Sequence, residues 1–415
     1  MKRILTLLIL AVLCTAIHAA DYRTLNGKVI DAQTRRPLSA ASIALSGTNI
    51  SNVTNSEGVF SLKVPEGTSG TVTVSFLGYL TVEKAMRDFL DATPEDPLVI
   101  QLLPVSIQLD PALVRPMDPI LVVKSAFSRV KQNYATDHVA MTGFYRELIR
   151  RGSKYIVLNE AVLDIDKAPS SSYGADQAQI YKGRGSINYD IHDTLAVKFQ
   201  GGIAAALDFD IVKNPFPGCY LPDIEKYYDF QMETPAAIDG RSFYVISFDQ
   251  KYSLEDILYR GRLYIDSETF AIGRAEVSMN VEKHEEEAAR YFIMSKPLRY
   301  RAYIETSTYT IHYRLLDDGL WSYDYIRMDL SFATRRRFIP FRTHYHVTNE
   351  LAVTDRRNDR LEIARKDRVR DRDILSDQVS DFTDPDFWGE YNIIEPDRDI
   401  QDILRRIVRQ LNRSK

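Results

Sequence analysis

The sequence predicts a mainly β protein: an N-terminal seven-stranded β-sandwich, a linking helix, a large antiparallel β domain that forms a curved sheet or half-barrel, and a C-terminal helix. Three observations predict this fold class. Short apolar segments recur about every ten residues from Leu25 to Leu103, each bounded by turn residues. Longer alternating segments rich in Tyr run from Met141 to about Leu361. Clear helical periodicity is found only between these two regions and at the C-terminal end.

Residues 1–20 have the pattern of a secretory signal peptide. Lys2 and Arg3 precede an apolar run from Ile4 to Leu13, and small residues follow up to Ala20. A membrane-spanning helix needs roughly 20 apolar residues, about twice the length of this run. Lipidation of Cys14 is the alternative, but Leu13 stands where a lipid-modification site requires a small residue. We therefore expect cleavage near Ala20 and an exported chain, periplasmic or associated with the outer membrane.

Residues 21–105 are predicted to form the sandwich. Asn55 to Gly58 make a hairpin turn, and Val59 to Val64 alternate before Pro65, which cannot donate to a β-ladder, ends the strand. The predicted strands are Leu25 to Ile30, Ala41 to Leu45, Asn52 to Thr54, Val59 to Val64, Thr71 to Phe76, Leu80 to Lys84 and Leu98 to Leu103.

Three stretches of this region carry a family resemblance: "LNGKVIDAQTRRPLSAASIALSGTN", "TNSEGVFSLKVPEG" and "VSFLGYLT". They resemble the carboxypeptidase-regulatory-like domain, a transthyretin-like sandwich common in secreted and outer-membrane proteins of Gram-negative bacteria. The resemblance implies a structural or docking module without catalytic residues of its own. It also implies docking at the outer membrane, because related sandwiches often precede receptor barrels there.

Residues 106–140 are predicted to hold a linker and an amphipathic helix. Asp118 can cap the helix and Pro119 suits its first turn. Apolar residues then recur at helical spacing, which indicates a helix that packs on one neighbour. These residues are Ile120, Val123, Phe127, Val130 and Tyr134.

Residues 141–365 are predicted to form the antiparallel β domain. Its clearest hairpin joins "TYTIHYRLL" to "LWSYDYIRMDL" across Asp317-Asp318-Gly319. The phrase "GRLYIDSETFAIGRAEV" resembles strand pairs of lipoprotein-carrier-like half-barrels, which implies a concave sheet that binds acyl chains. A closed membrane-spanning barrel is the alternative, but such a barrel would be expected to end in a strand. Residues 366–415 read instead as a charged linker and a helix with one apolar stripe, formed by Ile400, Ile403, Leu404, Ile407 and Leu411.

Charge and cysteine content exclude some classes of protein. The net charge of -4, from 53 basic and 57 acidic residues, argues against a nucleic-acid partner, which would require a basic face. If Cys14 leaves with the signal peptide, Cys219 stands alone and no intrachain disulfide is possible. We therefore expect burial alone to stabilise the fold.

No catalytic motif stands out, and the sequence predicts a non-catalytic protein without a cofactor. There is no Gly-x-Ser-x-Gly elbow, no phosphate-binding loop and no dinucleotide fingerprint. The alternative is a zinc hydrolase, for which His284 and Glu287 have a formal His-x-x-Glu spacing and His344 or His346 could add a ligand. One such match in a charged run is easily produced by chance, so these four residues are only weak metal candidates. A purely structural surface protein is the third alternative.

The predicted binding surface is the aromatic hairpin of the β domain. Aromatic residues at this density, if they are exposed, would mark a site for a lipid, a glycan or a protein of the envelope. The candidate residues are Tyr309, Tyr313, Trp321, Tyr323 and Tyr325. The ligand, the partner and the oligomeric state stay open at this point.

Overall fold

The computed structural model describes residues 22–105, 117–152, 154–187, 197–199, 202–217, 219–238, 240–379, 387–402 and 404–405. The expected signal peptide with Cys14 lies outside the described residues, as do Ile403, Ile407 and Leu411 of the expected C-terminal helix. Residues 398–402 belong to that helix and are helical. No helix in these described ranges is long and apolar enough to cross a membrane.

The N-terminal module is a sandwich of two sheets, and all seven predicted strands are confirmed. One sheet has the order β4-β1-β7 and the other the order β3-β2-β5-β6. The strands are β1 (Tyr22–Asp31), β2 (Ser42–Leu45), β3 (Ser51–Val53), β4 (Val59–Pro65), β5 (Thr71–Ser75), β6 (Val82–Ala85) and β7 (Leu98–Leu102), with a 3-10 turn, η1 (Met86–Phe89), between the last two. Phe60 and Leu62 of β4 are fully buried in the core between the sheets, as their alternation predicts.

The turn before β4 shows why this stretch of sequence is polar and contains a glycine. The Asn55 side chain accepts hydrogen bonds from the backbone N–H groups of Glu57 and Val59, at 3.0 and 2.9 Å. Gly58 has a φ of +73°, and a Cβ there would lie 2.4 Å from the carbonyl oxygen of Val29. Only glycine meets both conditions without strain.

The linking helix is confirmed, but it is divided into α2 (Pro119–Ser128) and α3 (Val130–Asn133). Asp118 caps α2 by accepting a hydrogen bond from the backbone N–H of Ile120 at 2.9 Å. Arg129 leaves helical geometry between the two helices, with φ -100° and ψ 11°. Both helices pack their apolar faces on the core of the β domain.

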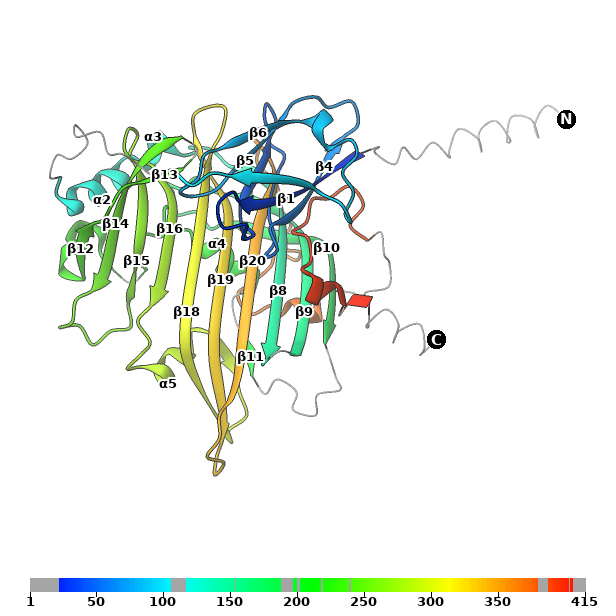
Figure 1. Ribbon diagram of the computed structural model, residues 1–415. Coiled ribbons are helices and arrows are strands. Elements are labelled where there is room, and N and C mark those ends of the chain that lie inside the picture. Colours follow the sequence, from blue (N-terminus) through cyan, green and yellow to red (C-terminus); the bar gives the residue numbers. More distant parts are fainter. Residues whose placement is uncertain are drawn as a thin grey trace, which may run out of the picture.

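The β domain is one open, antiparallel, 11-stranded sheet (Figure 1). Its order is β10-β9-β8-β20-β19-β18-β16-β15-β14-β12, with β13 also paired to β14. The strands are β8 (Val139–Arg151), β9 (Lys154–Lys167), β10 (Gln177–Ile187), β12 (Tyr228–Met232), β13 (Ala236–Ile238), β14 (Arg241–Gln250), β15 (Tyr259–Asp266), β16 (Ile272–Met279), β18 (Tyr300–Leu315), β19 (Trp321–Arg336) and β20 (Thr343–Arg357). The hairpin predicted across Asp317-Asp318-Gly319 joins β18 to β19.

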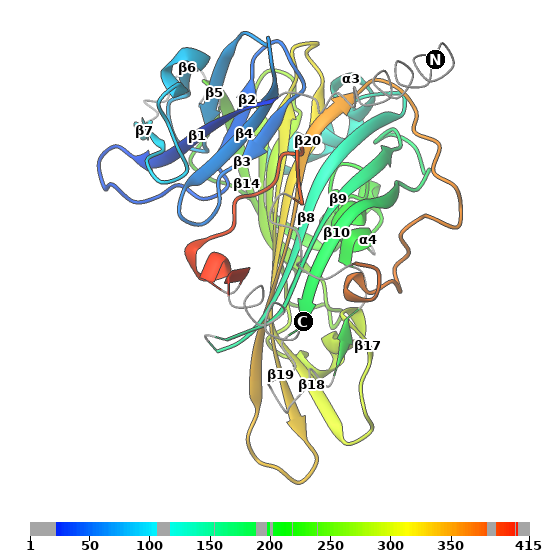
Figure 2. The ribbon, with the colours of Figure 1, turned by 90° about the vertical axis from the view of Figure 1, so that its right-hand side faces the viewer.

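Short elements connect these strands. They are β11 (Lys198–Phe199) paired with β17 (Ile293–Ser295), the helices α4 (Gly202–Asp208) and α5 (Glu285–Ala288), and the 3-10 turns η3 (Leu221–Lys226), η4 (Ala289–Tyr291) and η5 (Leu375–Asp377). Figure 2 shows the sandwich on one face of the large sheet and α4 on the other. We call the face toward α4 the inner face and the face toward the sandwich the outer face.

The sandwich and the C-terminal segment share the outer face. Val53 of β3 packs with Phe144, Tyr325 and Trp388 in one buried cluster, and the Ser51 hydroxyl donates to the carbonyl of Val353 at 2.9 Å. Residues 387–397 lie between the two bodies, where Asn392 bonds the backbone of β4. The sandwich is therefore docked on the sheet through side-chain and backbone contacts.

Candidate functional site

A large cavity of the β domain lies between the inner face of the sheet and the segments that cross it. It has a volume of about 860 Å³. Its wall is formed by the inner face of β8, β18, β19 and β20, by α4, and by the segment around Phe216 and Cys219. A second cavity of about 220 Å³ shares Glu147, Phe199 and Gly202 with it. Together they form the candidate ligand-binding site.

Strand register places one row of residues across this wall. Asn159 of β9 stands opposite Glu147 of β8, and Glu147 stands opposite Asn349 of β20. Asn349 is opposite Met328 of β19, which is opposite Tyr309 of β18. The row is polar at the β9 end and apolar toward β18, so the cavity has two chemically different ends.

The polar end holds a carboxylate and several acceptors removed from water. The amide of Asn159, which is fully buried, donates to Glu147 Oε1 at 3.0 Å. Burial raises the pKa of Glu147, and the hydrogen bond from Asn159 opposes that rise. Within the described residues, the buried oxygens Asn159 Oδ1, Asn349 Oδ1 and Tyr145 Oη have no hydrogen-bond partner. Buried polar atoms normally have one, and of these three residues only Asn349 lines the cavity, so Asn349 Oδ1 and the Glu147 carboxylate are the groups at this end that a ligand can bond.

The apolar end is lined by aliphatic and aromatic side chains. Met328, Leu330 and Val347 are at most 8% exposed and form its floor. The ring of Tyr309 stacks on Phe209, which follows α4, with centroids 3.6 Å apart and planes 8° from parallel. This contact connects the covering segment to the sheet at the edge of the cavity.

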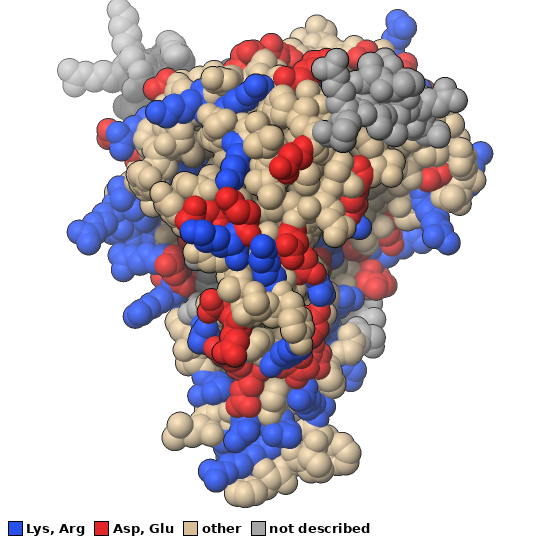
Figure 3. Space-filling view, turned by 90° about the vertical axis from the view of Figure 1, so that its left-hand side faces the viewer, with Lys and Arg blue, Asp and Glu red and all other residues tan. Residues whose placement is uncertain are grey.

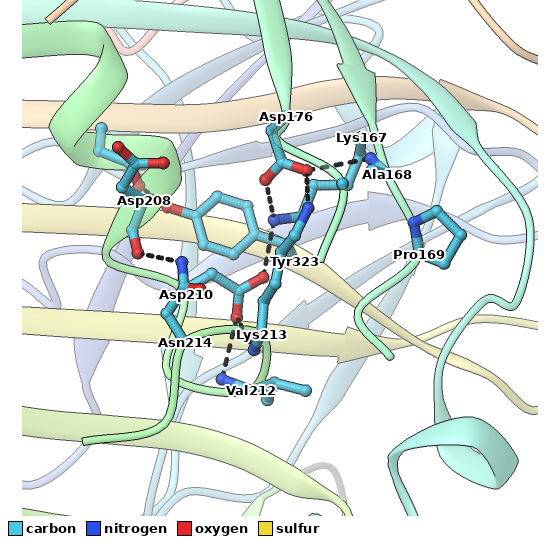
Figure 4. Close-up of polar contacts among 12 residues, drawn as sticks. Lys167, Ala168, Pro169, Asp176, Asp208, Asp210, Val212, Lys213, Asn214 and Tyr323 are labelled. Atoms are coloured by element: carbon cyan, nitrogen blue, oxygen red, sulfur yellow. Dashed lines mark hydrogen bonds and ion pairs between the residues drawn. The ribbon is translucent and has the colours of Figure 1, made fainter. Parts of the chain in front are cut away.

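A buried ion cluster attaches α4 and the turn that follows it to the sheet (Figure 4). Lys167 Nζ lies 2.7 Å from Asp210 and 2.6 Å from Asp176. The hydroxyl of Tyr313 donates to Asp210 at 2.5 Å, and that of Tyr323 donates to the carbonyl of Ala206 in α4 at 2.7 Å. Burial alone would raise the pKa of Asp210, but Lys167 and these hydrogen bonds hold it below its ordinary value. The cluster thus fixes α4 and the following turn over the sheet.

The aromatic residues predicted from sequence are not an exposed surface, and that expectation of exposure is wrong. Tyr309, Tyr313, Trp321, Tyr323 and Tyr325 are exposed by 8%, 6%, 5%, 3% and 1%. Tyr313 and Tyr323 have the structural contacts described above, and Trp321 packs against Phe243. Only Tyr309 lines the cavity, so ligand contact by this residue stays a prediction.

A β-bulge separates Tyr325 from the other four residues. His312 pairs with Tyr325 and Tyr313 pairs with Tyr323, which leaves Asp324 without a partner position on β18. The extra residue reverses the alternation, so Tyr325 lies in the outer cluster with Phe144 while Tyr323 lies in the inner core. Simple period-two counting along the sequence cannot detect such a reversal.

Of the four weak metal candidates, His284 and Glu287 pair with each other, whereas His344 and His346 each pair with another carboxylate. His284 Nδ1 lies 3.2 Å from Glu287, His344 Nδ1 lies 3.0 Å from Glu305, and His346 Nε2 lies 3.3 Å from Asp329. In the part of the chain that the structure describes, no group of three or more His, Cys, Asp or Glu side chains is arranged to hold a metal ion.

Sequence reasoning missed Glu147, Asn159 and Asn349. The only local signal is a polar residue at an inward position of an otherwise apolar alternating strand, such as Glu147 between Tyr145 and Ile149. These three residues are brought together by the register of β8, β9 and β20. β20 is some two hundred positions away from β8 along the chain, and no local pattern gives that register.

A comparison with family models agrees with the resemblance of the N-terminal module. A family model described as CarboxypepD_reg-like domain matches residues 25–109. No curated protein matches the chain significantly. The similar solved structures include a DUF1329 family protein from Desulfovibrio piger, which is 13% identical, covers 60% of this chain and 96% of its own, and has a TM-score of 0.26.

Two further structures are similar over comparable lengths. A LolA superfamily protein from Nitrosomonas europaea is 12% identical, with 61% of this chain and 99% of that chain covered and a TM-score of 0.23. MucB in complex with MucA(peri) is 10% identical, with 59% and 100% covered and a TM-score of 0.19. Likeness at this level says nothing about what this chain binds.

Proposed function

We propose that this chain is a non-catalytic binding protein of the Gram-negative envelope, whose β domain holds the apolar chain of an amphiphilic ligand. The observation that carries the proposal is the cavity of about 860 Å³, with an apolar floor at one end and the Glu147 carboxylate and the unsatisfied Asn349 oxygen at the other. A cavity of this size, mostly apolar and with a few convergent polar groups, is the usual form of a small-molecule site.

The polar end indicates the chemistry of the ligand's headgroup. Glu147 and Asn349 line this end and offer oxygen acceptors. A headgroup with hydroxyl or amine donors can bond them, whereas the carboxylate of a free fatty acid would meet another carboxylate and acceptor oxygens. We therefore favour a lipid or glycolipid whose head carries donors.

Export to the envelope is supported by the sequence of residues 1–20 and by the occurrence of related sandwiches in secreted proteins. Docking of the sandwich on an outer-membrane protein is a further part of the proposal. The zinc-hydrolase alternative requires stoichiometric zinc, which metal analysis of the purified protein would detect.

Native mass spectrometry of the protein isolated from its own envelope tests the proposal. A co-purified amphiphile is expected, and uptake of a fluorescent long-chain alcohol by delipidated protein should be saturable. Ala205→Phe puts a ring into the cavity from α4, so it should reduce uptake about ten-fold or more. Ala204→Phe is the matched control, because the adjacent Ala204 does not line the cavity. No bound amphiphile and no uptake by the wild type, or equal uptake by both variants, would contradict the proposal.

A further inference from the structure

A second feature lies at the end of the sheet, apart from the cavity. The hairpin of β19 and β20 and the adjacent start of β18 extend beyond the neighbouring strands and form the lowest point of Figures 1 and 2. We call residues 296–301 and 335–342 the tip. Its two loops lie side by side, because Tyr300 pairs with Arg336 and the backbone N–H of Arg337 donates to the carbonyl of Arg299 at 2.7 Å. The tip is therefore one continuous surface.

The apex of the tip is apolar and fully open to solvent. Leu298 is 105% exposed, Phe338 93%, Phe341 78% and Ile339 44%. Phe338 also has a φ of 70°, a backbone conformation that bulky residues rarely adopt. Single exposed apolar residues are common, but four at one projecting end of a folded domain indicate a binding surface. The packing of this domain does not explain them.

Basic residues surround this apex. The tip contains seven Lys and Arg residues and no Asp or Glu. They are Lys296, Arg299, Arg301, Arg335, Arg336, Arg337 and Arg342. Two of them pair with carboxylates of α5: Arg301 lies 3.6 Å from Glu286 and Arg342 lies 2.9 Å from Glu285. In Figure 3 blue Lys and Arg atoms lie around the tan apex at the bottom of the molecule, and red atoms lie higher.

The positive charge at the tip contrasts with the chain as a whole, whose net charge is -4. Exposed charges act over about 10 Å at moderate salt, so a nearby anionic surface meets the local charge of the tip and not the total. An anionic partner would therefore be attracted to this end of the molecule.

Aromatic contacts stiffen the base of the tip. The guanidinium of Arg342 lies 3.9 Å from the centre of the Tyr303 ring, and that of Arg335 lies 5.4 Å from the same ring. Tyr303 is only 6% exposed and is part of β18. The apex thus stands on a fixed strand pair, and a surface that binds it meets a preformed shape.

We propose that the tip is a membrane-docking site that inserts into the surface of an anionic bilayer. Leu298, Phe338 and Phe341 would enter the boundary between headgroups and acyl chains, and the surrounding Arg residues would bond lipid phosphates. The charge of the tip and its exposed apolar apex complement an anionic bilayer, and docking there needs no ligand in the cavity. This role goes beyond the proposed function, because it belongs to a second surface.

Vesicle sedimentation with the full chain tests this assignment. The probes are large unilamellar vesicles of phosphatidylglycerol and phosphatidylethanolamine. Vesicles of phosphatidylcholine alone are the comparison, because binding to them measures how much the apolar residues 4–13 contribute to vesicle binding. Phe338→Ser/Phe341→Ser should lower the partition coefficient for anionic vesicles about ten-fold or more. Arg336→Gln/Arg337→Gln should lower it about ten-fold at low salt, with a smaller difference at 0.5 M salt.

Matched controls separate the tip from exposed residues elsewhere. Tyr173 is 109% exposed and lies between β9 and β10, and the Arg87 side chain is 85% exposed on the sandwich. Tyr173→Ser and Arg87→Gln should bind vesicles like the wild type, and circular dichroism should show that every variant is folded. Equal binding of the wild type to both kinds of vesicle would overturn the proposal, as would wild-type binding by either double variant of the tip.

Discussion

Arg146 and Glu147 are consecutive residues of β8, and their side chains lie on opposite faces of the large sheet. Arg146 points to the outer face, where it donates to Glu160 at 2.7 and 2.9 Å and to the carbonyl of Ile394 at 2.6 Å. Glu147 points to the inner face and lines the cavity. One strand therefore both anchors the C-terminal segment and shapes the candidate site, so the two charges can be tested separately.

The first prediction concerns the buried ion cluster on the outer face. Glu160 is fully buried and is bonded by Arg146 and also by Arg184, whose Nη2 lies 2.8 Å away. Glu160→Gln removes the buried carboxylate that both guanidinium groups bond, so the free energy of unfolding should fall by about 3–5 kcal/mol. Urea denaturation at pH 7 measures the change. The control is Glu282→Gln, which removes a solvent-exposed pair with Arg260 and should cost less than about 1 kcal/mol.

The pH dependence of this effect follows from the pKa of Glu160. Burial would raise that pKa, but Arg146 and Arg184 outweigh burial and hold it below 4.5. The ionised form therefore stabilises the fold above pH 4.5, and this contribution is lost as the pH falls through the lowered pKa. The difference between wild type and Glu160→Gln should narrow below pH 4.5. A difference that stays constant there would contradict the assignment.

The second prediction concerns Glu147, for which the pH dependence of stability has the opposite sign. Burial raises the pKa of Glu147 above 4.5, so between the unfolded and folded pKa values the folded state holds more protons than the unfolded state. Wild-type stability should therefore fall as the pH rises through this window, and Glu147→Gln should not show that loss. Urea unfolding at pH 4 and pH 8 measures this difference. The free energy of unfolding of the variant, relative to that of the wild type, should be higher at pH 8 than at pH 4. No gain would mean that the carboxylate is hydrated in the folded protein.

The sandwich could be predicted strand by strand, whereas the candidate site could not. Val59 to Val64 alternate between a polar turn and Pro65, and such local signals are sufficient for a short antiparallel strand. β10 was missed because Gly183 and Gly185 interrupt its pattern. Their hydrogens leave space for Val379 and Asn159, since a Cβ at either glycine would lie within 2.6 Å of one of those side chains.

Strand ends and faces were the other sources of error. The apolar residues Phe338 and Ile339 suggest a strand there, but β20 begins at Thr343, because Phe338 to Arg342 form the turn at the tip. The bulge at Asp324 moved Tyr325 to the outer face. Both departures depend on how β19 pairs with its neighbours, and β pairing between distant segments is not encoded in a local period.

The third prediction uses Cys219 to report on the cavity. Cys219 is half-buried in the cavity wall, and burial raises the pKa of its thiol. In a Cys14→Ser background it should react with a maleimide more slowly than a free thiol does at pH 8, because less thiolate is present. A long-chain alcohol that occupies the cavity should slow the reaction further, by about ten-fold at saturation. Reaction rates that do not change with the alcohol would argue against occupancy beside Cys219.

The fourth prediction concerns the contact between the C-terminal segment and the sandwich. The side chain of Asn392 accepts a hydrogen bond from the backbone N–H of Lys63 at 2.7 Å and donates to the carbonyl of Lys63 at 3.0 Å. In the described part of the chain β4 lies at the edge of its sheet, so these two bonds engage backbone groups on the open side of the strand. Asn392→Ala should cost about 1–3 kcal/mol in the free energy of unfolding.

Hydrogen exchange at the Lys63 amide tests this contact most directly. In the wild type the amide should be protected, and Asn392→Ala should increase its exchange rate about five-fold or more, because the bond that closes it is gone. The exposed Asn358 supplies the control, since Asn358→Ala should leave both the exchange of Lys63 and the unfolding free energy unchanged. Slow exchange of Lys63 in Asn392→Ala would contradict the prediction that the Asn392 side chain protects this amide.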